Sequence, residues 1–190
     1  MTLLEIITPA NPALRHKANP VERVKEPQLQ QLIDQMIATM RHAHGVGLAA
    51  PQVAQPLRLV VIETPAEVDD DGEEIPDSRK LYTVINPQIT WASRKMVLGI
   101  EGCLSIPGYL GEVARHQAIK VEALDRMGRK LSLSLKGWDA RIFQHEIDHL
   151  DGILYTDRLT APENFWSEEE LRKQEEEEEK REQESKGERE

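Results

Sequence analysis

Apolar residues recur at helical spacing between Pro27 and His42, with polar residues at most positions between them. Pro27 stands at the start and Gly45 follows the end, which is the usual punctuation of a helix. The pattern therefore predicts a helix over 27–42 whose core-facing side is formed by Leu29, Leu32, Ile33, Met36, Ile37 and Met40.

Other segments show the patterns of β-strands. Residues 57–63 and 81–89 are rich in β-branched side chains, whereas 119–125 and 130–137 alternate apolar and polar residues. A turn around 125–128 joins the last two segments. We therefore predict two strands, followed by a β-hairpin with one face on the core.

A second helix is predicted from about Trp138 to Leu150, and it carries the pattern His-Glu-x-x-His. His145 and His149 lie one turn apart, so their imidazoles leave the same face and can hold one metal ion. Glu146 is close enough to reach a water on that ion. The helix also has a polar stripe that is either solvated or supports the ligands, formed by Arg141, Gln144, Asp148 and Asp151.

Two further segments carry residues suited to chemistry. Small residues over 45–52 let a backbone or a ligand approach closely, although a plain turn between helix and strand fits them equally well. If residues 98–108 are extended, Glu101, Cys103 and Ser105 face away from their apolar neighbours. Because two histidines are an incomplete ligand set, Cys103 is a candidate for the third metal ligand.

Charge and hydropathy exclude some classes of partner. The chain has 190 residues and a formal net charge of −10, with no basic stripe suited to nucleic acid. From Glu168 to Glu190 there are 12 Glu against 6 Lys or Arg, a net of −6, which leaves −4 for the body. No apolar run approaches the ~20 residues that cross a bilayer. We therefore expect no membrane partner and no nucleic-acid binding through the tail.

The length fits one domain with a proper core. We predict a catalytic domain over 1–166, including a proline-rich arm at 8–27 and an acidic surface loop at 64–80. Residues 167–190 form a charged acidic tail that is either helical or disordered. The single cysteine allows no intramolecular disulfide and fits a reducing compartment, so we expect a cytoplasmic protein.

Three motifs now stand in order along the chain. Residues 45–52 read Gly-Val-Gly-Leu-Ala-Ala-Pro-Gln, residues 101–105 read Glu-Gly-Cys-Leu-Ser, and residues 144–149 read Gln-His-Glu-Ile-Asp-His. Together they resemble the peptide deformylase family, whose signatures Gly-x-Gly-Leu-Ala-Ala-x-Gln, Glu-Gly-Cys-Leu-Ser and Gln-His-Glu-x-Asp-His they match without a mismatch. The resemblance covers roughly residues 3–160, and three signatures together are highly specific.

The resemblance implies a metal-dependent hydrolase that removes the N-formyl group, as formate, from the initiator methionine of newly made polypeptides. One divalent metal ion would be held by Cys103, His145 and His149, with a water in the fourth position. The family typically uses ferrous iron, and zinc or nickel also fit this ligand set. Glu146 would take a proton from the water and deliver it to the departing amine.

The same resemblance implies roles for residues around the reacting centre. The side-chain amide of Gln52 and the backbone N–H of Leu104 would stabilise the oxyanion that develops on the formyl oxygen. The backbone of Val46 and Gly47 would pair with the peptide substrate in the manner of a strand.

Four residues outside the tightest parts of the motifs complete the expected site. The methionine side chain needs an apolar cavity, for which Trp138 and Ile142, by their position on the metal helix, are candidates together with Val46. Glu101 and Arg115 resemble a charge pair that supports the cysteine segment.

Two other classes of function compete with this interpretation. A zinc peptidase of the metzincin type needs a third histidine where this chain has Tyr155, and a thermolysin-like site needs a downstream Glu ligand, for which Glu163 is the nearby candidate. A structural metal domain without activity would have a closed ligand set. Neither alternative accounts for Gln52 and Cys103.

The expected fold is α+β, with mixed or antiparallel β-sheets packed around a central metal-binding helix and an N-terminal helix beside them. The expected partners are N-formyl-methionyl nascent peptides and, transiently, the ribosome. Because the acidic tail would repel RNA, we do not expect it to dock the protein on the ribosome.

Overall fold

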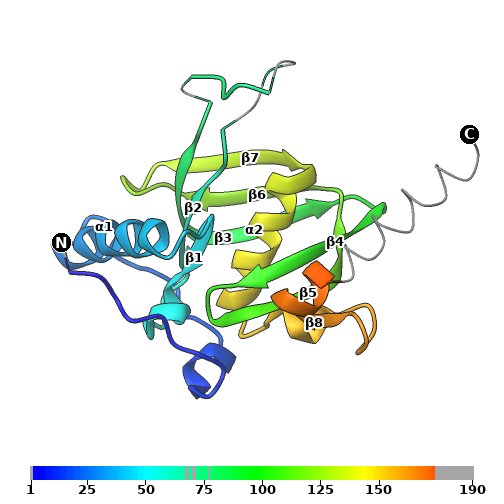
Figure 1. Ribbon diagram of the computed structural model, residues 1–190. Helices are drawn as coiled ribbons and strands as arrows, with labels where there is room; N and C mark the ends of the chain where they lie inside the picture. Colours follow the sequence, from blue (N-terminus) through cyan, green and yellow to red (C-terminus); the bar gives the residue numbers. More distant parts are fainter. Residues whose placement is uncertain (1, 67–68, 70–71, 77, 174–190) are drawn as a thin grey trace, which may run out of the picture.

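The computed structural model describes residues 2–66, 69, 72–76 and 78–173 (Figure 1). Within this part of the chain the strands form two sheets, with the orders β1-β2-β3-β6-β7 and β4-β5-β8. All pairings between these strands are antiparallel. The elements are η1 (Pro12–Arg15), α1 (Pro27–His42), β1 (Gly47–Ala49), η2 (Ala50–Val53), β2 (Leu59–Glu63), β3 (Leu81–Ala92), β4 (Met96–Cys103), β5 (Ile106–His116), β6 (Ala118–Leu124), β7 (Lys130–Lys136), α2 (Gly137–Leu150), η3 (Tyr155–Arg158) and β8 (Phe165–Ser167).

The five-stranded sheet has a helix on each face. Helix α1 spans the predicted residues, and its apolar side packs with Leu59 and Val61 of β2 in one buried cluster. Val60 and Ile62 alternate to the opposite face, where they join the buried residues of α2 in a second cluster. Strand β2 is therefore buried on both faces, which explains its continuous apolar sequence.

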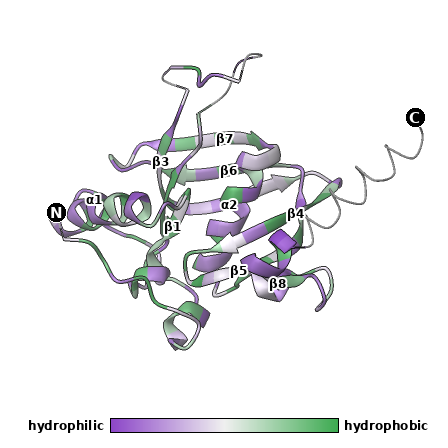
Figure 2. Cartoon of the chain, in the orientation of Figure 1, coloured by the Kyte–Doolittle hydropathy of each residue, from purple (hydrophilic) through white to green (hydrophobic). Residues whose placement is uncertain are grey.

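Helix α2 lies between the two sheets (Figure 1), and every residue from Ala140 to Leu150 is buried. Its apolar residues Phe143, Ile147 and Leu150 pack on the five-stranded sheet. Its polar residues face the three-stranded sheet. Figure 2 accordingly shows both hydrophilic and hydrophobic residues along the helix. The predicted α+β fold, with antiparallel sheets around a central helix, is confirmed.

The polar stripe of α2 is the surface that holds the three-stranded sheet. Arg141 donates to the backbone carbonyl oxygens of Val97 at 2.7 Å and Val113 at 2.9 Å, on β4 and β5. Gln144 donates to the carbonyl oxygen of His116 at 2.9 Å and accepts from its N–H at 3.1 Å. The sequence left open whether this stripe is solvated or supports the ligands. Arg141, Gln144 and Asp148 are buried, so the stripe is not solvated at these positions. Asp151 remains partly exposed.

Local sequence signals placed four of the eight strands in the described residues, namely β2, β3, β6 and β7. The predicted hairpin appears as β6 and β7, and the strand predicted over 57–63 begins two residues later, at Leu59. The neighbouring Leu57 instead forms an isolated bridge with Asn19 of the N-terminal arm. Strand β5 was not expected, because Pro107, Gly108 and Gly111 interrupt its pattern.

The predicted division at residues 166 and 167 falls within β8, whose Ser167 is paired with Tyr109 of β5. Residues 168–173 are helical. Residues 174–190 lie outside the described residues, so the helical or disordered state of the tail stays a prediction.

Candidate metal and active site

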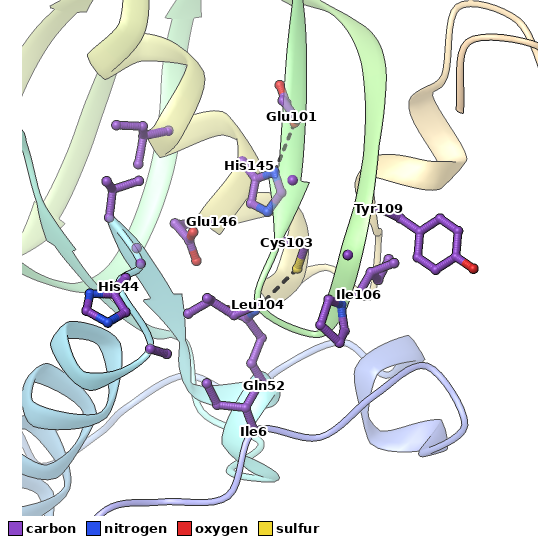
Figure 3. A pocket seen from close by; sticks show the side chains of 18 of the residues that line it. Ile6, His44, Gln52, Glu101, Cys103, Leu104, Ile106, Tyr109, His145 and Glu146 are labelled. Atoms are coloured by element: carbon purple, nitrogen blue, oxygen red, sulfur yellow. Dashed lines mark hydrogen bonds and ion pairs between the residues drawn. The ribbon is translucent and has the colours of Figure 1, made fainter. Parts of the chain in front are cut away.

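The last two turns of α2 carry the two histidines, and the end of β4 carries the cysteine. One ligand atom each from Cys103, His145 and His149 lie within 4.8 Å of one another. Cys103 Sγ is 3.3 Å from His149 Nε2, and Figure 3 shows Cys103, His145 and Glu146 around one space. A thiolate and two imidazole nitrogens at this separation fit one divalent metal ion.

The burial of these ligands suits a metal. His149 is 1% exposed, and its Nδ1 atom has no hydrogen-bond partner among the described residues. Burial lowers the pKa of His149 well below its ordinary value, and the charge of His145 adds to this effect. The ring of His149 is therefore neutral, which is the form that binds a metal.

Glu101 orients the second histidine. Its carboxylate lies 2.9 Å from His145 Nδ1, which turns the other ring nitrogen toward the cysteine. It also accepts two hydrogen bonds of 2.9 Å from Arg115 and one of 2.8 Å from Arg141. Burial alone would raise the pKa of Glu101, but the hydrogen bonds from Arg115 and His145 hold it far below its ordinary value. Glu101 is thus a buried anion between two guanidinium groups and the ring of His145.

The pKa of His145 is shifted in the opposite direction to that of His149. Burial alone would lower the pKa of His145, but its interactions with Cys103 and Glu101 raise it to about 10. A metal ion bound to this ring takes the place of the proton, because only the neutral imidazole is a ligand.

Glu146 lies beside the ligands with one carboxylate oxygen free. Its Oε2 atom is buried and has no hydrogen-bond partner among the described residues. Burial raises the pKa of Glu146 to about 7; His145 opposes this rise and Glu101 adds to it. The carboxylate is pressed against Gly47, where a Cβ atom would lie 2.7 Å from Glu146 Cδ. Such a carboxyl group can both take and give a proton.

Gln52 is 1% exposed. Its side chain is fixed through the amide oxygen Oε1, which accepts a hydrogen bond of 2.8 Å from the backbone N–H of Ala49. Its amide nitrogen is aimed at the ligand set, 3.4 Å from Cys103 Sγ and 3.3 Å from Ser105 Oγ (Figure 3). Leu104 follows the cysteine, and its side chain lies so close to Gly45 that a Cβ there would be 2.6 Å from it. The small residues of 45–52 therefore let two other segments approach.

A cavity of about 530 Å³ opens onto these groups. Most of the residues predicted for the site line it, while His149 and Arg115 lie behind its wall. Ile142 is buried there, whereas Val46 and Trp138 are 39% and 51% exposed. The predicted residues that line the cavity are Val46, Gly47, Gln52, Glu101, Cys103, Leu104, Trp138, Ile142, His145 and Glu146.

Comparison with known proteins decides the family. A model of the polypeptide deformylase family matches residues 3–165. Peptide deformylase 2 of a Nostoc species is 46% identical over 173 residues, which cover 90% of this chain and 94% of the relative. This chain belongs to the polypeptide deformylase family.

Solved structures of deformylases agree. The crystal structure of peptide deformylase from Thermotoga maritima matches with a TM-score of 0.74 at 35% identity, over 85% of this chain and 100% of that one. The Met-Ala-Ser-bound class I type b peptide deformylase from Acinetobacter baumannii matches with a TM-score of 0.73 at 36% identity, over 83% and 99%. The predicted family and enzyme class are confirmed: the chain is a hydrolase of the family that removes the N-formyl group from newly made polypeptides.

Some residues of the deformylase site had no assigned role in the motifs. Arg141 lines the cavity and ties α2 to Glu101 on β4, and Tyr155 packs beside His145. Asp148 receives hydrogen bonds of 2.5 Å from both Arg115 and Arg158, which extends the charge network behind the ligands. The sequence already placed Arg141 and Asp148 in the polar stripe of the helix but did not tell whether they are buried, and it gave Tyr155 no role in the site.

The ligand group indicates a divalent metal ion. The Cys/His/His group fits a divalent ion of the kind that deformylases use, as predicted. Among the described residues no helix is long and apolar enough to cross a membrane.

Proposed function

We propose that Cys103, His145 and His149 hold one divalent metal ion, which is Fe²⁺ in the cell, with Zn²⁺ and Ni²⁺ as alternatives. The ligand set supports this because thiolate and imidazole together accept any of the three ions. When bound, the metal polarises the formyl oxygen and lowers the pKa of a water.

Glu146 is the proposed general base and acid. Glu146 lines the cavity beside the ligand set, and its buried Oε2 atom has no hydrogen-bond partner among the described residues; this is the observation that carries the proposal. The carboxylate takes the proton of the attacking water and then gives it to the amine of methionine as the C–N bond breaks. Burial among Gly47 and the helix keeps bulk water away from that transfer.

The oxyanion is proposed to be stabilised by the Gln52 amide and the Leu104 N–H. The contact of Gln52 Nε2 with Ser105 Oγ is long, at 3.3 Å, so the amide can give it up for a better acceptor. Its contact with Cys103 Sγ, at 3.4 Å, is of ordinary length for a sulfur acceptor. The side-chain carbonyl oxygen of Gln52 is held by the N–H of Ala49, so the amide can turn only about that oxygen and its NH₂ group moves. Preorganised donors of this kind each contribute about 10²–10³ in rate.

The substrate is proposed to lie along β1, which is an edge strand of its sheet. The carbonyl oxygen of Val46 already accepts from Glu63 N–H at 2.9 Å, so antiparallel alternation turns the groups of Gly47 toward the free edge. Ile142 and Trp138 supply apolar walls for the methionine side chain. The Acinetobacter baumannii relative was solved with Met-Ala-Ser bound, which supports a peptide as the ligand of this chain as well.

The test is formate release from formyl-Met-Ala-Ser by protein purified and assayed without oxygen. We expect stoichiometric formate and free Met-Ala-Ser, with no release of acetate from acetyl-Met-Ala-Ser, because an acetyl methyl group needs room that a formyl hydrogen does not. Cleavage between Met and Ala would instead establish a peptidase. A metal-loaded protein that releases nothing would contradict the proposal.

Location and further partners are also proposed. We infer a cytoplasmic enzyme that meets the ribosome transiently, because its substrates are newly made and its one cysteine is a ligand candidate that needs reducing conditions. The net charge of −6 over 168–190 supports a tail that does not bind RNA. Cosedimentation with ribosomes should then be equal with and without residues 168–190. A salt-sensitive loss on deletion would contradict this role for the tail.

A further inference from the structure

Tyr155 is a large, fully buried residue for which the proposed reaction has no use. It begins η3, ten residues after His145, and is 1% exposed. Its ring lies beside the ring of His145, with the centroids 6.1 Å apart and the planes at 23°. The ring of His149 meets His145 nearly at right angles, at 5.0 Å. With Glu101 holding Nδ1, His145 is thus confined by three neighbours.

The other end of Tyr155 reaches the cavity wall. Its hydroxyl donates to the backbone carbonyl oxygen of Tyr109 at 3.0 Å, and Tyr109 is a residue of β5 that lines the cavity. The side chain of Tyr109 stacks on Phe165 of β8, with centroids at 5.2 Å and planes at 5°. Phe165 in turn lies 6.4 Å from the ring of Tyr155. One side chain therefore contacts both a metal ligand and the strand that borders the substrate.

The neighbouring strand leaves room for this ring. A Cβ atom on Gly111 of β5 would lie 2.4 Å from Leu159 Cδ2 and 3.1 Å from Tyr155 Cε2, so the glycine makes room for both side chains. Gly111 is also paired with Phe165 across the β5–β8 ladder. The break in the apolar pattern of β5 thus coincides with the place where Tyr155 is seated.

We propose that Tyr155 is a positioning residue with two separable actions: its ring holds His145 in the orientation that binds metal, and its hydroxyl holds the Tyr109 segment of the substrate cavity. This inference rests on the proposed metal site and deepens it. If the His145 ring tilts, the site binds metal more weakly, because loss of a contact that orients a metal ligand typically lowers metal affinity about 10–100-fold. If the carbonyl group of Tyr109 loses this hydrogen bond, the part of the cavity wall formed by Tyr109 can shift. Substrate binding is then weaker, while the reacting groups stay in place.

Two variants separate the actions. Tyr155→Phe keeps the ring and removes the hydroxyl, so we expect KM for formyl-Met-Ala-Ser to rise about 3–10-fold with kcat and metal affinity unchanged. Tyr155→Leu removes the ring, so we expect about 10-fold weaker Co²⁺ binding and a shifted visible absorption spectrum of bound Co²⁺. Tyr82→Phe is the matched control, because Tyr82 packs against Phe143 on the opposite side of α2.

The outcomes are distinct. An unchanged KM in Tyr155→Phe would overturn the action of the hydroxyl, even if the variant were less stable. A wild-type Co²⁺ spectrum and affinity in folded Tyr155→Leu would overturn the action of the ring. If the wild-type protein released no formate, the proposed function would fail, yet the Co²⁺ measurements would still decide whether Tyr155 positions His145.

Discussion

Replacing Gly47 by alanine should disable Glu146 while leaving the metal ligands in place. The added Cβ atom would lie 2.7 Å from Glu146 Cδ and 2.8 Å from Cγ. Carbon atoms in contact are ordinarily about 3.5–4.0 Å apart, so the carboxyl group has to retreat by about 1 Å. Both partners are buried, on β1 and α2, so the backbone has little freedom to absorb the overlap.

The expected cost follows from this displacement. A misplacement of about 1 Å in a reacting group lowers the rate about 10²-fold. We therefore predict that Gly47→Ala lowers kcat about 100-fold. The three atoms nearest to the new Cβ all belong to Glu146 and none to Cys103, His145 or His149, so the content of bound metal should be unchanged.

The assay is formate release under saturating formyl-Met-Ala-Ser, with metal content measured on the same samples. A double-mutant cycle with Glu146→Ala tests the cause, because Gly47→Ala should cost almost nothing further once the carboxylate is absent. Equal losses from Gly47→Ala in both backgrounds would refute the reasoning, since the glycine would then act through something other than Glu146. Full activity of the single variant would refute it as well.

The remaining predictions concern the support of the site, the core and the metal. Glu101→Gln removes the carboxylate that two buried guanidinium groups share, although Arg115 keeps Asp148, so it should destabilise the fold by about 3–5 kcal/mol in urea unfolding and weaken metal binding about 10–100-fold in a chelator competition. Wild-type values of both would contradict the network. Met36→Ala opens a cavity in the buried cluster between α1 and β2, so it should lower the free energy of unfolding by about 2–5 kcal/mol and leave kcat unchanged. A lower kcat in the folded variant would show that this cluster is linked to the active site. Removal of metal by a chelator should abolish formate release reversibly and lower stability by about 4 kcal/mol relative to metal at 1,000 times its Kd, and an unchanged thermal midpoint would argue against a site in the folded state.

Local signals predicted the elements whose sequence decides their structure. Helix α1 has its apolar spacing and its flanking Pro27, and the β6–β7 hairpin has its alternation and the Gly128 turn with φ of +79°. Strand β5 has neither, because Pro107 and two glycines dilute its pattern. Its extended state comes from pairing with β4 on one side and β8 on the other, which no local pattern reports.

The same distinction applies to the site. The motifs contain the ligand group because His145 and His149 are one helical turn apart and Cys103 ends the adjoining strand. Arg141 could not be placed from sequence, because its burial depends on four acceptors that β4 and β5 bring to it. The roles of the individual site residues stay predictions until variants are measured.

The most direct test of the account is kcat of Glu146→Gln beside the wild-type enzyme, at equal metal content and without oxygen. The substitution keeps the size of the side chain and removes the group that takes and gives the proton. We predict that kcat falls at least about 10²-fold while bound metal and the unfolding midpoint stay close to wild type. Formate release at the wild-type rate would contradict the central claim that this carboxylate, beside the Cys/His/His site, carries the proton in deformylation.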